Sequence, residues 1–137
     1  MKIQPITGKE IAKFIDLCDS MRIRRASYDY YNTAKDGDFY GVGMYINREL
    51  RGVSACDYER KYGITLLRKA YQQKGHGKTL LKHKIDHFNE KKIPYETTVA
   101  ADNIPSFKMC HAVGLKVIKA EIKTRSSGEY ITLTLGN

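Results

Sequence analysis

Apolar residues recur at helical spacing at two places along the chain. The first set begins after Thr7 and predicts a helix over about residues 8–20. Its members are Ile11, Phe14, Ile15 and Cys18. Thr7 and Glu10 match the S/T-x-x-E capping box, so we expect the helix to begin directly after Thr7. The second set marks one face of a later helix and consists of Leu81, Ile85 and Phe88.

Caps and turn residues predict the remaining elements. Asn103, Pro105 and Gly114 suit a cap, a first turn and a helix end, which predicts a helix over 103–115. Alternation around a turn signal at 47–49 predicts a β-hairpin over 39–58. Further strands are expected at 2–6, 64–67, 95–99, 115–123 and 130–135, and a short helix within 21–38 that ends at Asp36-Gly37.

The resulting order, β-α-α-β-β-β-α-β-α-β-β, predicts an α/β fold with a sheet of mixed strand direction. With 137 residues, 42% of them hydrophobic, we expect a single domain over residues 1–137. No apolar run approaches the roughly 20 residues of a membrane helix, and the first residues lack the layout of a signal peptide. We therefore expect a cytoplasmic protein with no membrane partner.

The net charge of +9 suits an anionic ligand, either a nucleic acid or a polyphosphate cofactor, or else a solubilising surface. No metal site is predicted, because the three cysteines are scattered without a CxxC. His83 and His87 are four residues apart, as in HExxH, but Lys84 replaces the glutamate of that motif.

A glycine-rich stretch, 71-YQQKGHGKTLL-81, stands where a strand is expected to lead into a helix. A Walker A loop would match its 77-GKT-79, but Gln72 occupies the place of the first glycine. The Rossmann fingerprint G-x-G-x-x-G needs its third glycine where Leu80 stands. Spacing therefore excludes both nucleotide-binding loops.

The stretch does satisfy Q/R-x-x-G-x-G/A, with Gln72, Gly75 and Gly77 at the fixed positions. Glycines there let backbone N–H groups turn inward, and the dipole of the following helix adds positive potential. Such a loop suits a diphosphate. It resembles the coenzyme A pyrophosphate loop of the GNAT acetyltransferase superfamily.

A second signature of this family is matched about 30 residues later by Asn103, Ser106 and 114-GL-115. The resemblance implies a mostly antiparallel central sheet of about six or seven strands, with splayed parallel strands 4 and 5 and about four flanking helices. It also implies an acetyl-CoA-dependent N-acetyltransferase that moves the acetyl group directly to a primary amine.

The resemblance further implies which residues contact coenzyme A. Backbone groups of Leu67, Arg68 and Lys69 would pair with the pantetheine arm. The pyrophosphate would be held by the backbone amides of Gln72, Gln73, Lys74, Gly75, His76, Gly77, Lys78 and Thr79. Asn103 and Ser106 would touch the pantetheine or phosphate side from the following helix.

The general acid and base of the reaction are less defined. Cys110 stands where many members of the family carry a tyrosine that acts as the acid. A thiol could protonate a coenzyme A thiolate of similar basicity. Alternatively, Cys110 is a small hydrophobic residue buried on the inner face of the helix. No acidic residue lies from Lys61 to Gln73. Two carboxylates are candidate bases, beside deprotonation through water: Asp57, expected opposite the middle of the fourth strand, and Glu96, at the beginning of the fifth.

The acceptor amine stays open at this point: lysine side chains, protein N-termini, polyamines, aminoglycosides and small amines all fit. The resemblance implies that residues 22–40 form one wall of its site. The basic chain favours a neutral or anionic acceptor, unless acids line the site: Asp36, Asp38, Asp57 or Glu59.

Two other functions are carried as alternatives. The missing tyrosine would suit a non-catalytic acyl-CoA-binding module. The charge, together with Tyr28, Tyr30 and Tyr31 beside 22-RIRR-25, would suit a nucleic-acid-directed transferase or binder. In each case we expect a monomer or a homodimer.

Overall fold

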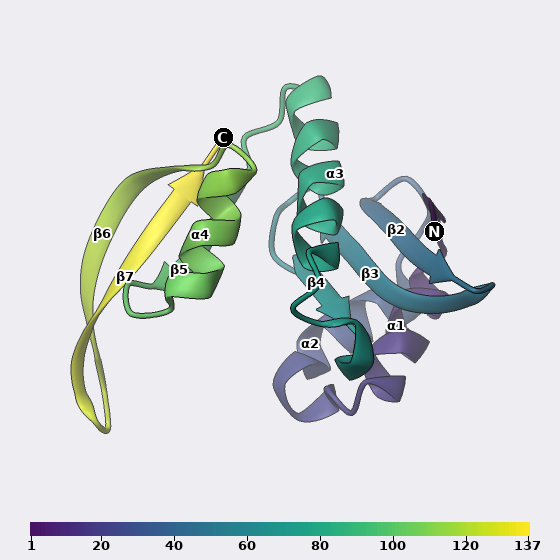
Figure 1. Ribbon diagram of the computed structural model, residues 1–137, viewed down its shortest axis with the longest axis horizontal. Helices are drawn as coiled ribbons and strands as arrows, with labels where there is room; N and C mark the ends of the chain where they lie inside the picture. Colours follow the sequence, from purple (N-terminus) through teal and green to yellow (C-terminus); the bar gives the residue numbers. More distant parts are fainter. The chain divides into compact units, whose positions relative to one another are not determined.

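The computed structural model describes residues 1–137 and contains four α-helices and seven strands in the predicted order (Figure 1). These helices and strands confirm the predicted α/β class. All strand pairings within the two sheets are antiparallel. The chain divides into two compact units, Met1–Lys84 and Ile85–Asn137. The predicted splay of strands 4 and 5 involves both units and stays a prediction.

A four-stranded sheet organises the first unit. Its strands follow one another in chain order: β1 (Lys2–Pro5), β2 (Phe39–Ile46), β3 (Glu49–Asp57) and β4 (Ile64–Leu67). The predicted hairpin is confirmed, and its turn residues Asn47 and Arg48 have φ angles of 53° and 67°, the positive values that a tight two-residue turn requires. β4 pairs only with residues 52–55 of β3 and forms the edge of the sheet.

Helix α1 (Gly8–Leu17) begins at the predicted capping box. The Thr7 hydroxyl accepts a hydrogen bond from the Glu10 N–H at 3.2 Å, and the Glu10 carboxylate accepts one from the Thr7 N–H at 3.0 Å. The helix ends before the predicted residue 20 because Asp19 has a positive φ of 55°. Helix α2 (Met21–Thr33) follows, with a kink at Arg24.

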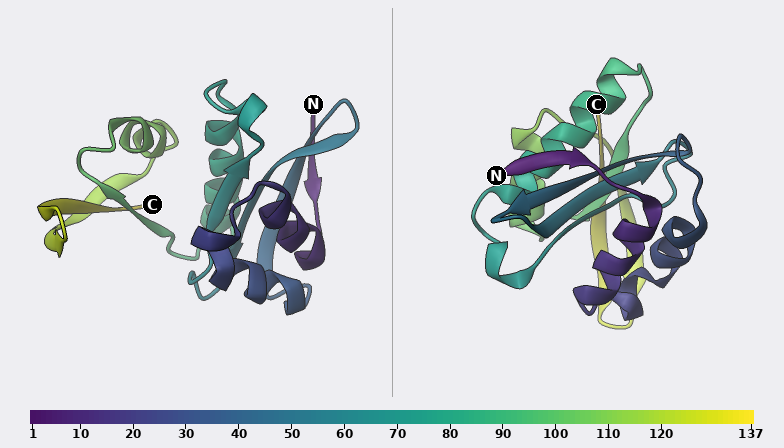
Figure 2. Two further views of the ribbon diagram at one scale, coloured as in Figure 1. Left: turned by 90° about the horizontal axis from the view of Figure 1, so that it is seen from below. Right: turned by 90° about the vertical axis from the view of Figure 1, so that its right-hand side faces the viewer.

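Helices cover both faces of this sheet (Figure 2). α1 and α2 bury one face in the main core, which includes Ile11, Phe14, Ile15, Tyr31, Phe39, Val53 and Ile64. On the other face, Leu80 from α3 (His76–Glu90) packs with Val42 and Met44. α3 is therefore held against the sheet close to the glycine-rich stretch that precedes it.

The second unit contains a three-stranded sheet in the order β5 (Glu96–Ala100), β7 (Gly128–Gly136) and β6 (Lys116–Arg125). Helix α4 (Ile104–Ala112) lies over one face of it (Figure 1). The Asn103 side chain caps this helix and Gly114, with φ 95°, follows its end, as predicted. None of the helices is long and apolar enough to cross a membrane.

Candidate functional site

The glycine-rich stretch is tied to the strand before it. A 3-10 turn at Lys69–Tyr71, which the sequence pattern did not predict, separates β4 from the loop. The Gln72 side chain donates a hydrogen bond to the Leu67 carbonyl at 3.2 Å, and its backbone N–H donates to the Lys69 carbonyl at 3.3 Å. Gln72, a fixed position of the motif, thus anchors the loop to the end of β4.

Unpartnered backbone donors gather directly after Gln72. The N–H groups of residues 73–78 donate no hydrogen bond within the protein, whereas the Thr79 N–H donates to the Gly75 carbonyl at 3.1 Å. Gln73 and Gly75 have left-handed φ angles of 60° and 85°. A Cβ on Gly75 would meet no atom within 4 Å, so the glycine serves the backbone conformation rather than close packing.

The charges around the loop are positive. No acidic residue occurs between Lys61 and Ile85, and the Lys74 ammonium lies 5.9 Å from the centre of the Tyr71 ring. The guanidinium of Arg51, on β3, lies 5.1 Å from the centre of the same ring, and its Nε is buried without a hydrogen-bond partner. The guanidinium of Arg51 is ion-paired with Glu49 at 2.7 Å, so Lys74 is the cation left without an acidic partner. Free amides, a helix N-terminus and this lysine together fit a diphosphate, so the residues present suit this part of coenzyme A.

Arg51 and Tyr71 were not among the residues that the sequence singled out. The hydrogen bond from the Arg68 N–H to the Arg51 carbonyl, at 2.9 Å, brings β3 beside the start of the loop. Only the register of β3 on β4 reveals this neighbour, because Arg51 belongs to no local motif.

The end of β4 offers part of the predicted pantetheine contact. Both backbone groups of Arg68 are engaged within the protein, since its carbonyl accepts the Tyr71 N–H at 2.8 Å. The Arg68 N–H is therefore not available to the pantetheine arm, and its carbonyl already accepts one of the two hydrogen bonds it can accept. In an antiparallel pair the backbone N–H and C=O groups of successive residues point to opposite edges of the strand. Because the Arg68 N–H points toward β3, the backbone groups of Leu67 point away from β3, toward the open edge of the sheet. The Leu67 and Lys69 contacts stay predictions.

In the second unit, three of the predicted residues lie on or beside α4. The side-chain Oδ1 of Asn103 accepts a hydrogen bond from the Ser106 N–H at 3.4 Å, which makes Asn103 a helix cap. Cys110 is only 4% exposed and belongs to the buried residues of this unit. None of the cysteines forms a disulfide.

The two candidate bases occupy different surroundings. Glu96 is exposed at the beginning of β5. Asp57 is only 2% exposed and ends β3. The expectation that Asp57 lies opposite the middle of β4 is wrong, because Ile64, the first residue of β4, already pairs with Ala55. Asp57, the last residue of β3, thus lies directly before the β3–β4 turn, at the end of β4 away from the loop.

Asp57 caps this turn. Its Oδ1 accepts the backbone N–H groups of Lys61 at 2.9 Å and Tyr62 at 2.7 Å. We predict that Asp57→Ala lowers the free energy of unfolding by about 2 kcal/mol, because both N–H groups lose their acceptor. Asp57→Asn keeps that acceptor, so its loss should be about half as large in urea denaturation. Equal losses for the two variants would contradict the capping role.

Comparisons with known proteins bear on the fold. No model of a known protein family matches the chain, and no match is found among curated proteins. Solved structures do match. The ribosomal-protein-alanine N-acetyltransferase from Brucella melitensis is 12% identical, with a TM-score of 0.77 over 100% of this chain and 99% of that one. An acetyltransferase of the GNAT family from Streptococcus pneumoniae is 14% identical, with a TM-score of 0.72 over 99% and 97%. The chain has the GNAT fold.

A third structure, Arabidopsis thaliana NAA60 in complex with a bisubstrate analogue, has the same fold at 12% identity, with a TM-score of 0.68 over 99% of this chain and 96% of that one. In each case the likeness spans both units of the GNAT fold. Since the identities are 12–14%, the geometry of this chain's own residues has to identify its site.

Proposed function

We propose that residues 1–137 form one acetyltransferase domain that moves an acetyl group from acetyl-CoA to a primary amine. The observation that carries the proposal is the row of unpartnered N–H groups at residues 73–78, at the beginning of α3. The GNAT fold supports it, since the similar structures include a ribosomal-protein-alanine N-acetyltransferase.

In this proposal the loop holds the pyrophosphate through backbone donors, and the positive charge of Lys74 adds to the attraction. The open edge of β4 at Leu67 orients the pantetheine arm, and Asn103 and Ser106 contribute from α4. Acetyl-CoA supplies a thioester that an uncharged amine can attack. The backbone amides of the loop and the helix dipole bind the cofactor, and other residues carry out the chemistry.

Proton transfer needs a base for the ammonium group and an acid for the departing thiolate. We propose Cys110 as the acid, and either Glu96 or Asp57 as the base. Replacing each carboxylate by its amide, Glu96→Gln and Asp57→Asn, and recording the pH profile of kcat distinguishes them. The base is the residue whose loss removes the acidic limb of the profile.

The first test is calorimetric titration of the protein with acetyl-CoA, followed by release of free thiol in the presence of a panel of primary amines. We expect saturable binding and amine-dependent thiol release. Absence of acetyl-CoA binding would refute the proposal. Binding without transfer to any amine would favour a non-catalytic acyl-CoA-binding module instead.

The role of Cys110 gives a second prediction. Loss of a general acid typically costs a factor of about 100 to 10,000 in rate, so Cys110→Ala should lower kcat at least about 100-fold with little change in the KM for acetyl-CoA. Cys18→Ala is the matched control, because Cys18 lies outside the proposed site, and its kcat should be that of the wild type. A Cys110→Ala variant of normal kcat would leave Cys110 as a packing residue only.

A further inference from the structure

A cleft of about 410 Å³ lies within the first unit, away from the phosphate loop. It is lined by Tyr30, Gly37, Asp38, Asp57, Tyr58 and Glu59. Three of these six residues are acidic, although the chain as a whole carries a charge of +9. Its volume falls in the range of about 300–1,000 Å³ that small-molecule sites occupy.

A buried carboxylate opens into this cleft. Asp57 is 98% buried, and its Oδ1 is occupied by the two N–H groups of the turn. Its second oxygen, Oδ2, has no hydrogen-bond partner in the protein. Among the side-chain polar atoms without a partner, only Arg51 Nε is fully buried. Asp57 Oδ2 is therefore not fully buried, and it is accessible from the cleft that Asp57 lines. A carboxylate oxygen in this position can accept a charge-assisted hydrogen bond from a cationic ligand.

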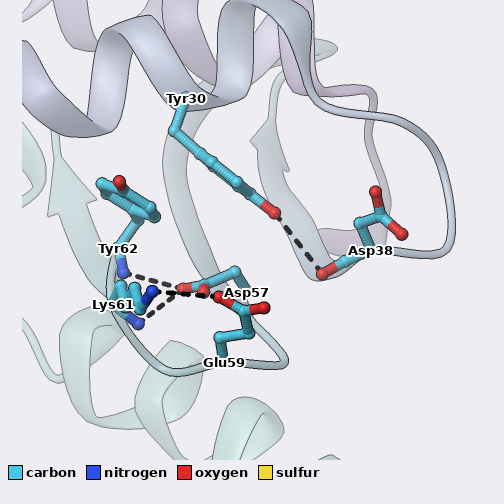
Figure 3. Close-up of polar contacts among 6 residues, drawn as sticks. All are labelled: Tyr30, Asp38, Asp57, Glu59, Lys61 and Tyr62. Carbon is cyan, nitrogen blue, oxygen red and sulfur yellow. Dashed lines mark hydrogen bonds and ion pairs between the residues drawn. The ribbon is translucent and has the colours of Figure 1, made fainter.

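An aromatic wall faces the carboxylates (Figure 3). The Tyr30 ring is stacked on Tyr62 with ring centres 4.5 Å apart and planes 13° from parallel. The Tyr30 hydroxyl reaches across to the Asp38 carbonyl at 3.5 Å. Burial first, and then the negative charges of Asp57, Asp38 and Glu59, raise the pKa of Tyr30. The tyrosine therefore stays neutral and experiences the field of all three carboxylates.

The shape and chemistry of the cleft select an organic cation rather than a metal ion. No three acidic, histidine or cysteine side chains are grouped closely enough to hold a metal. The carboxylates line a larger space beside a tyrosine ring, an arrangement that suits a protonated amine on an aliphatic chain. Carboxylates repel phosphate groups, so a nucleic acid does not fit here.

One acid of the cleft already has a cationic partner in the protein. Glu59 forms an ion pair with Lys61 at 3.2 Å, and the side chains of Lys61 and Glu59 are 65% and 76% exposed. An exposed pair of this kind contributes little to stability. A ligand ammonium group can therefore displace the Lys61 ammonium from Glu59, whereas the buried Asp57 stays in place.

We propose that this cleft is a binding site for the ammonium group of an aliphatic amine, with Asp57, Asp38 and Glu59 as its anionic partners and Tyr30 as its wall. The binding itself does not require acetyl transfer. If the proposed function also holds, the same site would favour a cationic acceptor, and local charge would outweigh the basic character of the whole chain.

The experiment is calorimetric titration of the full chain with 1,4-diaminobutane in the absence of acetyl-CoA, with 1,4-butanediol as the uncharged analogue. We expect the diamine to bind and the diol not to bind. The exposed double variant D38N/E59Q should lower the affinity for the diamine at least tenfold, and Asp57→Asn should lower it while the turn keeps its cap.

Two further variants make the result specific. Asp16→Asn removes the same charge from the exposed face of α1 and should leave the affinity unchanged. Lys61→Ala removes the internal competitor and should raise the affinity about threefold. Equal binding of diol and diamine, no binding of the diamine, or equal losses in Asp16→Asn and D38N/E59Q would overturn the proposal. Acetyl-CoA is titrated separately, so its failure to bind counts against the acetyltransferase alone.

Discussion

Gly77→Glu should abolish most of the affinity for acetyl-CoA while leaving the protein fully folded. Gly77 is the second residue of α3, and no acidic side chain lies in the first turn of that helix. A glutamate there would bring a negative charge against the pyrophosphate. Two unit charges about 4 Å apart repel by about 4 kcal/mol at the effective dielectric of a protein surface. We expect a loss of about 100-fold or more in affinity, since each 1.4 kcal/mol is tenfold.

Gly77→Glu should not lower the stability of the fold, so a loss of affinity for acetyl-CoA can be attributed to the introduced charge. An acidic residue in the first turn of a helix interacts favourably with the helix dipole, and glutamate has a higher helix propensity than glycine. The free energy of unfolding should therefore be unchanged or higher. Gly77→Gln has nearly the same size without the charge and should keep most of the affinity. Equal losses in both variants would mean that bulk, not charge, excludes the cofactor.

Local motifs were sufficient to predict much of the fold. The Thr7–Glu10 box and the Asn103 cap each depend on residues three apart in the sequence, and both are present as hydrogen-bonded caps. The glycine-rich loop lies between β4 and α3 as expected, and Gln72 proves to be its anchor. These features were predictable because short-range geometry determines them.

Features that depend on strand register or on distant segments could not be predicted in this way. The predicted position of Asp57 opposite β4 was wrong because β4 pairs with only four residues of β3, which leaves Asp57 beyond the end of that pairing, next to the turn. The acidic cleft combines Tyr30 of α2 with residues 37–38 and 57–59. From the sequence, Asp38, Asp57 and Glu59 were candidates to line an acceptor site in an otherwise basic chain. Only the packing of α2 against the turn brings them together.

The position of α2 also depends on Gly8, where α1 meets α2 without a side chain between them. A Cβ at this position would lie 2.3 Å from the Tyr31 carbonyl oxygen of α2 and 3.3 Å from its carbonyl carbon. Because the obstacle is backbone, α1 and α2 have to move apart. Tyr31 is completely buried, and its hydroxyl donates a hydrogen bond to the Tyr62 carbonyl at 2.7 Å. We expect Gly8→Ala to lower the free energy of unfolding by about 3 kcal/mol, at the upper end for overpacking.

Gly63→Ala is the matched control for this prediction. Its nearest neighbour would be the Cys56 sulfur at 3.5 Å, an ordinary contact, so its stability in urea should change by less than about 1 kcal/mol. If the two variants unfold at the same urea concentration, the helices are not in contact at Gly8. The displacement also reaches the cleft, because Tyr30 adjoins the obstructed Tyr31 and stacks on Tyr62. The surviving folded Gly8→Ala protein should therefore bind 1,4-diaminobutane more weakly than Gly63→Ala does, which would connect the α1–α2 contact to the position of the cleft's aromatic wall.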